Sequence, residues 1–197
     1  MIRKYIIFPL FVIILFSIYV NYSTYKSLII QNTVLKEYRS PKVYTFDILD
    51  SVLPSIPNIT ITAMPLDVFK ANYLLSEGRL DEVDKYIERA KKINPHTYVG
   101  DFLDGKLLYY RGSYDSAFVS SKRAFYGWPK NIDHYNSYVD VLEKLSDTIS
   151  LINAFNFLEN NLKERPEYFE RFYSSFNKIK LSFLVTNYPD AVSVNRD

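Results

Sequence analysis

The chain has 197 residues, 48% of them hydrophobic and 23% charged, which is enough for one membrane segment and one modest domain. The net charge of +2 lacks the basic footprint of a nucleic-acid-binding protein, so we expect no nucleic-acid partner. With no cysteine, disulfides, thiolate metal sites and a lipid-modified cysteine anchor are excluded. The 18 Tyr and 14 Phe leave two interpretations open, an aromatic binding surface or the bias of an AT-rich coding genome.

Residues 1–24 have the pattern of a membrane anchor. Arg3 and Lys4 precede an apolar run that extends from residue 5 to Tyr22, or roughly 27 Å of helix. The bulky residues at the end of this run do not resemble the small residues of a signal-peptide cleavage site, which favours an uncleaved anchor over the alternative of a cleaved signal. If this is the only span, the basic pair places the N-terminus in the cytoplasm and the rest of the chain outside it, which in a bacterium means the periplasm.

Residues 25–65 are expected to form a spacer. Apolar residues recur at helical spacing from Tyr25 to about Arg39, where Pro41 would end the helix, and Phe46 begins a second short helical piece. Prolines at 54, 57 and 65 then predict an extended connector, in which residues 59–62 are a weak strand candidate.

A pattern with a period of 34 residues begins near residue 66. It is carried by six matched pairs: Gly78/Gly112, Leu80/Tyr114, Asp81/Asp115, Val83/Ala117, Ala90/Ala124 and Pro95/Pro129. This period is typical of a tetratricopeptide-like helix–turn–helix unit, so we predict an all-α fold, a short solenoid of helical hairpins.

Each matched position has a mechanical interpretation. The glycines end the first helix of each hairpin with φ > 0, and the aspartates cap the second helix. The alanines allow close helix packing, and the prolines end the second helix. A third, degenerate unit follows, in which Asp147 is a plausible cap and the bulky Leu151 and Leu158 stand where small residues are expected.

The predicted domain spans residues 66–185. It comprises units at about 66–95, 98–129 and 132–165, a capping helix at 167–185 whose phenylalanines close the open end, and a tail at 186–197.

Residues 71–129 resemble the tetratricopeptide repeat family. A narrower resemblance rests on the order of seven short segments: Pro57-Asn58-Ile59-Thr60, Met64-Pro65, Lys70-Ala71-Asn72-Tyr73, Ile93-Asn94-Pro95, Ala124-Phe125, Pro129-Lys130-Asn131 and His134-Tyr135. In this order they resemble the repeat tail of bacterial O-antigen ligase/polymerase-like membrane proteins. Since this chain has one span where that family has many, the resemblance implies association with surface-polysaccharide assembly without the ligase activity.

In the repeat family, the first helices of successive units line a concave groove that binds a peptide or helix of a protein partner. By register, the groove candidates here are Asn72, Lys106, Tyr109, Asn136 and Asp140. Val68, Leu75, Phe102 and Glu143 fall in the same register, where the apolar ones are equally well explained as packing between helices. The acidic Asp140 and Glu143 argue against a clamp for a partner's carboxylate.

Residues for chemistry are scarce. His96 and His134, the only histidines, are expected at turns between units as surface residues, without the neighbours that a metal site or general base needs. We therefore expect no catalytic, cofactor-binding or metal-binding residues and no enzyme. The sequence favours a membrane-anchored scaffold for protein–protein interaction, and the alternative is a carbohydrate- or lipid-binding module of the bacterial envelope.

Overall fold

The computed structural model describes residues 2–38, 42–53, 58–161 and 165–187. Within these ranges the secondary structure is helical, and Ile59 and Pro65 form one isolated antiparallel bridge in place of the strand considered for residues 59–62. The all-α prediction is therefore confirmed for the described part of the chain. Several predicted features lie outside the described residues: the helix end at Pro41, prolines 54 and 57, the end of the third unit at 162–164, and residues 188–197 of the tail.

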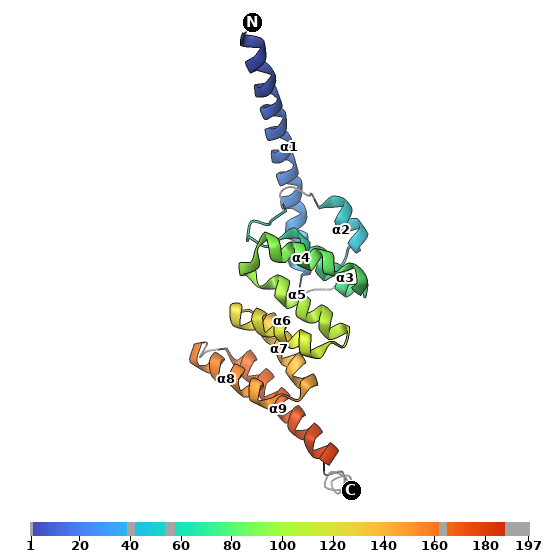
Figure 1. Cartoon of the computed structure of the whole chain (residues 1–197), viewed down its shortest axis with the longest axis vertical. Helices are drawn as coiled ribbons and strands as arrows, with labels where there is room; N and C mark the ends of the chain where they lie inside the picture. Colours follow the sequence, from blue (N-terminus) through green and yellow to red (C-terminus); the bar gives the residue numbers. More distant parts are fainter. Residues whose placement is uncertain (1, 39–41, 54–57, 162–164, 188–197) are drawn as a thin grey trace. The chain divides into compact units, whose positions relative to one another are not determined.

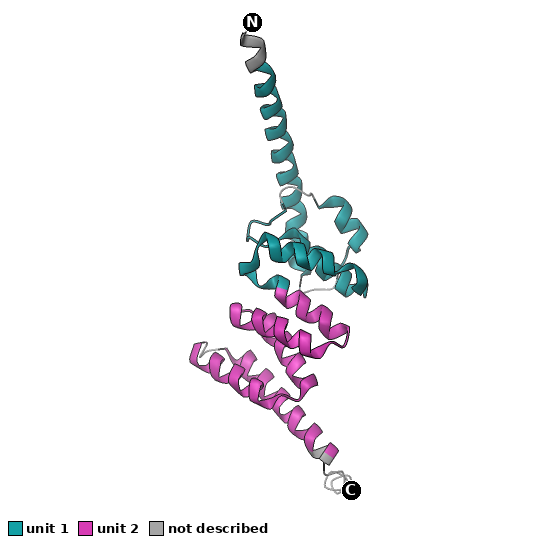
Figure 2. Ribbon diagram, viewed as in Figure 1, with its two compact units in different colours: residues 1–100 teal, residues 101–197 magenta. Residues whose placement is uncertain are grey.

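The chain divides into two compact units, residues 1–100 and 101–197 (Figure 2). Unit 1 contains the elements α1 (Ile2–Glu37), α2 (Phe46–Val52), α3 (Leu66–Ser76), the 3-10 helix η1 (Leu80–Glu82), α4 (Asp84–Ile93) and the 3-10 helix η2 (Pro95–Thr97). Unit 2 contains most of α5 (Val99–Tyr110), with α6 (Tyr114–Gly127), α7 (Ile132–Leu145), α8 (Thr148–Asn161) and α9 (Pro166–Asn187) (Figure 1).

Helix α1 is continuous over 36 residues, so the predicted anchor and the first part of the spacer are one helix. Its segment Ile7–Glu37 is long and apolar enough to cross a membrane. From Ile7 to Ile18 its large apolar side chains are exposed, and none of the described segments covers them. Exposure of so much apolar surface to water is unfavourable, so such a helix is stable where an apolar phase or a partner covers it.

The C-terminal end of α1 packs on α3. The Tyr73 hydroxyl donates a hydrogen bond to the Glu37 carboxylate, and both residues are buried. The Tyr38 ring meets Phe69 edge-on at a centroid distance of 5.9 Å, and the Asn72 amide lies 3.4 Å from the Tyr38 carbonyl oxygen. The C-terminal end of α1 is thereby joined to α3 by polar and apolar contacts.

The short helix α2 confirms the helical piece predicted after residue 46. Thr45 caps it, and its Phe46 and Leu49 are buried. Helix α2 packs on α3, and the exposed ion pair between Lys70 and Asp50, at 2.6 Å, joins the two helices.

Three turns at intervals of 34 residues share one backbone conformation. Gly78 and Gly112 have φ of 72° and 76°, as expected, and Ser146 takes the same left-handed conformation with φ of 55° after α7. After each turn the next amide donates to a carbonyl five residues earlier, for example Asp147 N to Leu142 O at 3.0 Å. This is the Schellman ending of a helix, so the third hairpin keeps the turn geometry although its glycine is lost.

The predicted caps are correct at one position in three. Asp147 accepts a hydrogen bond from the Ser150 amide at 2.9 Å and caps α8. The prediction for Asp81 is wrong because the extra turn η1 delays the start of α4 to Asp84, and Val83 stands at its N-cap without a side-chain bond. Asp115 is already inside the first turn of α6, where its charge favours the helix dipole without capping it.

The core of unit 2 lies between α6, α7, α8 and α9. Leu151 and Leu158 are buried like Ala117 and Ala124, which precede them by 34 residues, so the positions correspond although the side chains are larger. Helices α5 and α6 approach closely at Gly105, where a Cβ atom would lie 3.1 Å from the Ser121 amide nitrogen.

Candidate functional site

A charged face in unit 2 is the strongest candidate for a binding site. It is formed by side chains from three helices, which are Lys106 and Tyr109 of α5, Asp140 and Glu143 of α7, and Arg171 and Lys178 of α9. We call it the α5/α7/α9 face. Helices α7 and α9 pack on one another, and α5 joins α7 through the Phe102 ring, which stacks on His134 at 5.0 Å.

Ion pairs connect α7 to α9 across this face. Arg171 contacts Asp140 at 2.5 Å and Glu143 at 3.2 Å, and Lys178 contacts Glu143 at 2.5 Å. The Glu143 side chain is only 10% exposed, whereas that of Asp140 is 51% exposed. Asp140 therefore remains accessible, while Glu143 belongs mainly to the packing of α9 on α7.

The two carboxylates have opposite pKa shifts. Burial raises the pKa of Asp140, and the Arg171 guanidinium only partly offsets this effect. Burial also opposes ionisation of Glu143, but hydrogen bonds from Lys178 and Ser175, together with Arg171, leave its pKa below the usual range. Glu143 is thus held as an anion between two cations.

The α5 side of the face is half-buried. Burial lowers the pKa of Lys106, and the nearby carboxylates of Asp133 and Asp140 act in the opposite direction. The Lys106 ammonium lies 5.5 Å from the Phe102 ring centroid, so an aromatic surface supports its stem. Burial raises the pKa of Tyr109, and the charge of Asp140 adds to this shift.

The structure brings together three of the five predicted groove residues, namely Lys106, Tyr109 and Asp140. Asn136 is half-buried on α7, and its Oδ1 is enclosed without a hydrogen-bond partner among the described residues. Asn72 belongs to unit 1, where it is buried and directed to the Tyr38 carbonyl of α1. The C-terminal end of α1 therefore lies against Asn72, at the position where a partner was predicted to bind.

Sequence reasoning missed Arg171 and Lys178. They lie on the predicted capping helix, and the prediction of that helix rests on its apolar residues alone. A signal existed, because two basic residues seven positions apart lie on nearly one side of a helix and could face the unexplained acidic pair on α7.

The prediction for His134 is wrong. It is fully buried in α7, and its Nδ1 lies 3.0 Å from the Ala124 carbonyl oxygen. Because α7 begins at Ile132, His134 is inside the helix instead of in the turn before it. His96, in η2, is exposed as expected.

Within the described ranges, no group of three or more His, Asp or Glu side chains is arranged to hold a metal ion. No family model, curated protein or solved structure matches this chain. The resemblance to tetratricopeptide repeats and to the tail of O-antigen ligase-like proteins therefore stays a prediction.

Proposed function

We propose that this chain is a membrane-anchored scaffold of tetratricopeptide-like hairpins whose α5/α7/α9 face binds a segment of a protein partner. The observation that carries the proposal is that six polar side chains from three helices come together on one face, with Lys106 and Tyr109 contributed by α5. The apolar helix α1 supports the anchor, and the recurring left-handed turns support the repeat.

The composition of the face favours a polar peptide with an apolar or aromatic anchor. Its cations Lys106, Arg171 and Lys178 stand beside the anions Asp140 and Glu143, and Asp133 lies near Lys106, so a ligand of one charge sign would meet repulsion as well as attraction. Exposed ion pairs such as that of Asp140 are weak and are readily exchanged for pairs with a partner. The half-buried Tyr109 offers a rigid, amphipathic contact.

Affinity capture from solubilised membranes tests the proposal. We expect the full chain to retain a specific partner, and the double variant Lys106→Ala/Tyr109→Ala to lose most of it. The matched control, Val119→Ala/Lys122→Ala, removes two exposed side chains from α6 outside the face and should leave recovery unchanged. Equal recovery by both double variants would exclude the face as the partner site.

The proposed topology places the part of the chain that follows the span outside the cytoplasm, since Arg3 and Lys4 precede the span. Because the native chain has no cysteine, one cysteine at the exposed Ile61 gives a clean probe. A membrane-impermeant maleimide should label Ile61→Cys in right-side-out vesicles and not in inside-out ones. The reverse pattern would place the units in the cytoplasm. A partner from surface-polysaccharide assembly is proposed on the family resemblance alone.

A specific observation supports carbohydrate binding as a second candidate. Tyr109 lies edge-on to both Tyr110 and Tyr114, at centroid distances of 6.2 and 5.5 Å, and Tyr110 is 53% exposed. Exposed tyrosine rings beside polar groups suit the apolar face of a sugar. Calorimetric titration with envelope oligosaccharides would support this candidate if Tyr110→Ala abolishes the heat of binding. Absence of binding by the full chain would rule it out.

A further inference from the structure

We propose that unit 1 holds an acyl chain of a bilayer phospholipid in the pocket between α1 and α2. This inference rests on the membrane anchor of the proposed function and adds a ligand site to it. The pocket has a volume of about 170 Å³, and its lining residues are Ile29, Ile30, Thr33, Tyr44, Ile48, Leu49 and Val52.

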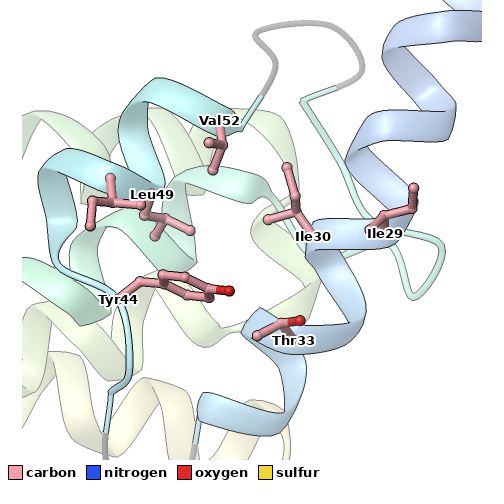
Figure 3. Close-up of a pocket in the computed structure, with 7 residues that line it drawn as sticks. Ile29, Ile30, Thr33, Tyr44, Leu49 and Val52 are labelled. Atoms are coloured by element: carbon pink, nitrogen blue, oxygen red, sulfur yellow. The ribbon is translucent and has the colours of Figure 1, made fainter.

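The lining matches a hydrocarbon ligand. Five of its seven side chains are aliphatic, and Ile30 and Thr33 face Tyr44, Leu49 and Val52 across the opening (Figure 3). Among the described lining residues, the only polar side-chain atoms are the hydroxyls of Thr33 and Tyr44. A pocket with so few polar groups gains little from a charged or strongly hydrogen-bonding ligand.

Helix α2 has an apolar side that its packing on α3 does not use. Phe46, Leu49 and Leu53 are buried, whereas Ile48 and Val52 remain 48% and 42% exposed. Ile48 and Val52 are four residues apart, so they form one stripe directed to the pocket. Ile29 on the α1 side is 56% exposed. Clustered exposed aliphatic side chains indicate a surface that is covered in use.

The position along α1 identifies the cover as lipid. The segment from Ile7 to Lys26 is roughly 29 Å long, which matches a hydrocarbon core of about 30 Å. Lys26 lies over the Tyr22 ring at 5.2 Å, a pair suited to the membrane–water boundary. Ile29 follows one turn later, or roughly 5 Å beyond, which is within the headgroup layer.

A continuous apolar path connects the bilayer with the pocket. Phe8, Leu15, Tyr22 and Ile29 are spaced by seven residues and therefore lie almost in line on one side of α1. All four are exposed. Lys26 lies on the same side between Tyr22 and Ile30, where its ammonium can pair with the lipid phosphate. One chain of that lipid lies along α1 in the bilayer, and the other enters the pocket.

Tryptophan quenching by lipids with brominated acyl chains tests the site. The full chain is reconstituted in phosphatidylcholine vesicles with its single tryptophan removed as Trp128→Phe, and one new tryptophan is added at a time. Ile48→Trp and Val52→Trp probe the pocket from two lining positions whose side chains are 48% and 42% exposed. Phe8→Trp reports the span, and Asp47→Trp is the matched control on α2, 76% exposed and outside the pocket lining.

We expect brominated chains to quench Ile48→Trp and Val52→Trp to an extent comparable with Phe8→Trp, and to leave Asp47→Trp unquenched. Adding Lys26→Gln should weaken quenching at residues 48 and 52 only. Quenching at residue 8 without quenching at 48 and 52 would overturn the lipid site and leave the anchor intact. Equal quenching at residue 47 would mean that α2 as a whole is immersed, which contradicts a pocket ligand. No quenching at residue 8 would refute the anchor itself, and the lipid site with it.

Discussion

At the scale of single residues, the clearest constraint on the sequence is the left-handed position that follows the first helix of each helical hairpin. It is occupied by Gly78, Gly112 and Ser146, all with positive φ. Glycine adopts this conformation without a steric cost, whereas a residue with a Cβ atom loses about 1–2 kcal/mol. The third hairpin therefore carries a strained serine where the first two carry glycine.

Replacing that serine should stabilise the chain. We expect Ser146→Gly to raise the free energy of unfolding by about 0.5–1 kcal/mol, because relief of backbone strain exceeds the entropy cost of glycine. Gly78→Ala, at a site where a Cβ meets no atom within 4 Å, should lower it by about 1 kcal/mol through backbone strain alone. Urea unfolding in detergent micelles measures both. A stabilising Gly78→Ala or a destabilising Ser146→Gly would contradict the strain argument.

The charge of Glu143 predicts a pH dependence. Its pKa is lowered in the folded chain, so its contribution is fully present above the unfolded value of about 4.3 and is lost as pH falls through the folded value. We expect Glu143→Gln to cost about 1–2 kcal/mol at about pH 7, since it leaves Arg171 and Lys178 without their shared carboxylate. At about pH 3, below the unfolded value, the deficit should be smaller than at about pH 7.

Thermal unfolding of both chains at the two pH values checks this prediction. The Glu143 charge also contributes to the raised pKa of Asp140, so the comparison reports the two neighbouring carboxylates together. An equal deficit at both pH values would show that the side chain acts by packing and not by charge.

Residue roles were predictable where the cause is local. The glycines, the prolines and the Asp147 cap follow from the backbone needs of a helix end. The Asp81 cap was not predictable, because the extra turn η1 shifts the helix start by a few residues. The prediction for His134 is wrong for the same reason, because a small shift of a helix end moves a side chain from a turn into the core.

At the scale of helices, the close approach of α5 and α6 depends on Gly105. A Cβ atom there would lie 3.1–3.3 Å from the backbone and Cβ of Ser121, which are held by α6 and cannot swing aside. We expect Gly105→Ala to destabilise the chain by about 1 kcal/mol, because overpacking of about 1–3 kcal/mol exceeds the helix-propensity gain of about 1 kcal/mol. The double variant with Ser121→Gly should recover part of the loss. Thermal unfolding of these variants at one pH measures the effect. An unchanged or raised midpoint for Gly105→Ala would contradict the close packing of α5 on α6 at this glycine.

The helices themselves were largely predictable, and their contacts were not. The 34-residue period and the prolines locate α3 to α8 within a few residues. The helical spacing from Tyr25 to about Arg39 predicts the C-terminal part of α1, but nothing local indicates that Glu37 lies against Tyr73, 36 residues later. The pairing of Arg171 and Lys178 with α7 is equally distant in sequence. Such contacts depend on the path of the chain in space, which a pattern along the sequence does not specify.

At the scale of the whole molecule, the proposed scaffold combines three functions in 197 residues. Helix α1 provides an apolar segment that only a membrane or a partner can cover. Within unit 1, α3 attaches to α1 through the buried Tyr73–Glu37 pair, and unit 2 presents the α5/α7/α9 face. The hydrogen bond from Tyr73 to the Glu37 carboxylate is a buried polar contact within unit 1. Such contacts favour one packing of the helices over alternatives that would leave the buried polar groups unpaired.

Site-specific photo-crosslinking in intact cells tests the central claim most directly. A benzoyl-phenylalanine replaces Tyr109 on the face in one chain and the exposed Val119 on α6 in another. The proposed function predicts a discrete crosslinked protein from position 109, its loss when Lys106→Ala is added, and no such product from position 119. No product at 109, or the same product at both positions, would contradict a partner site on the α5/α7/α9 face.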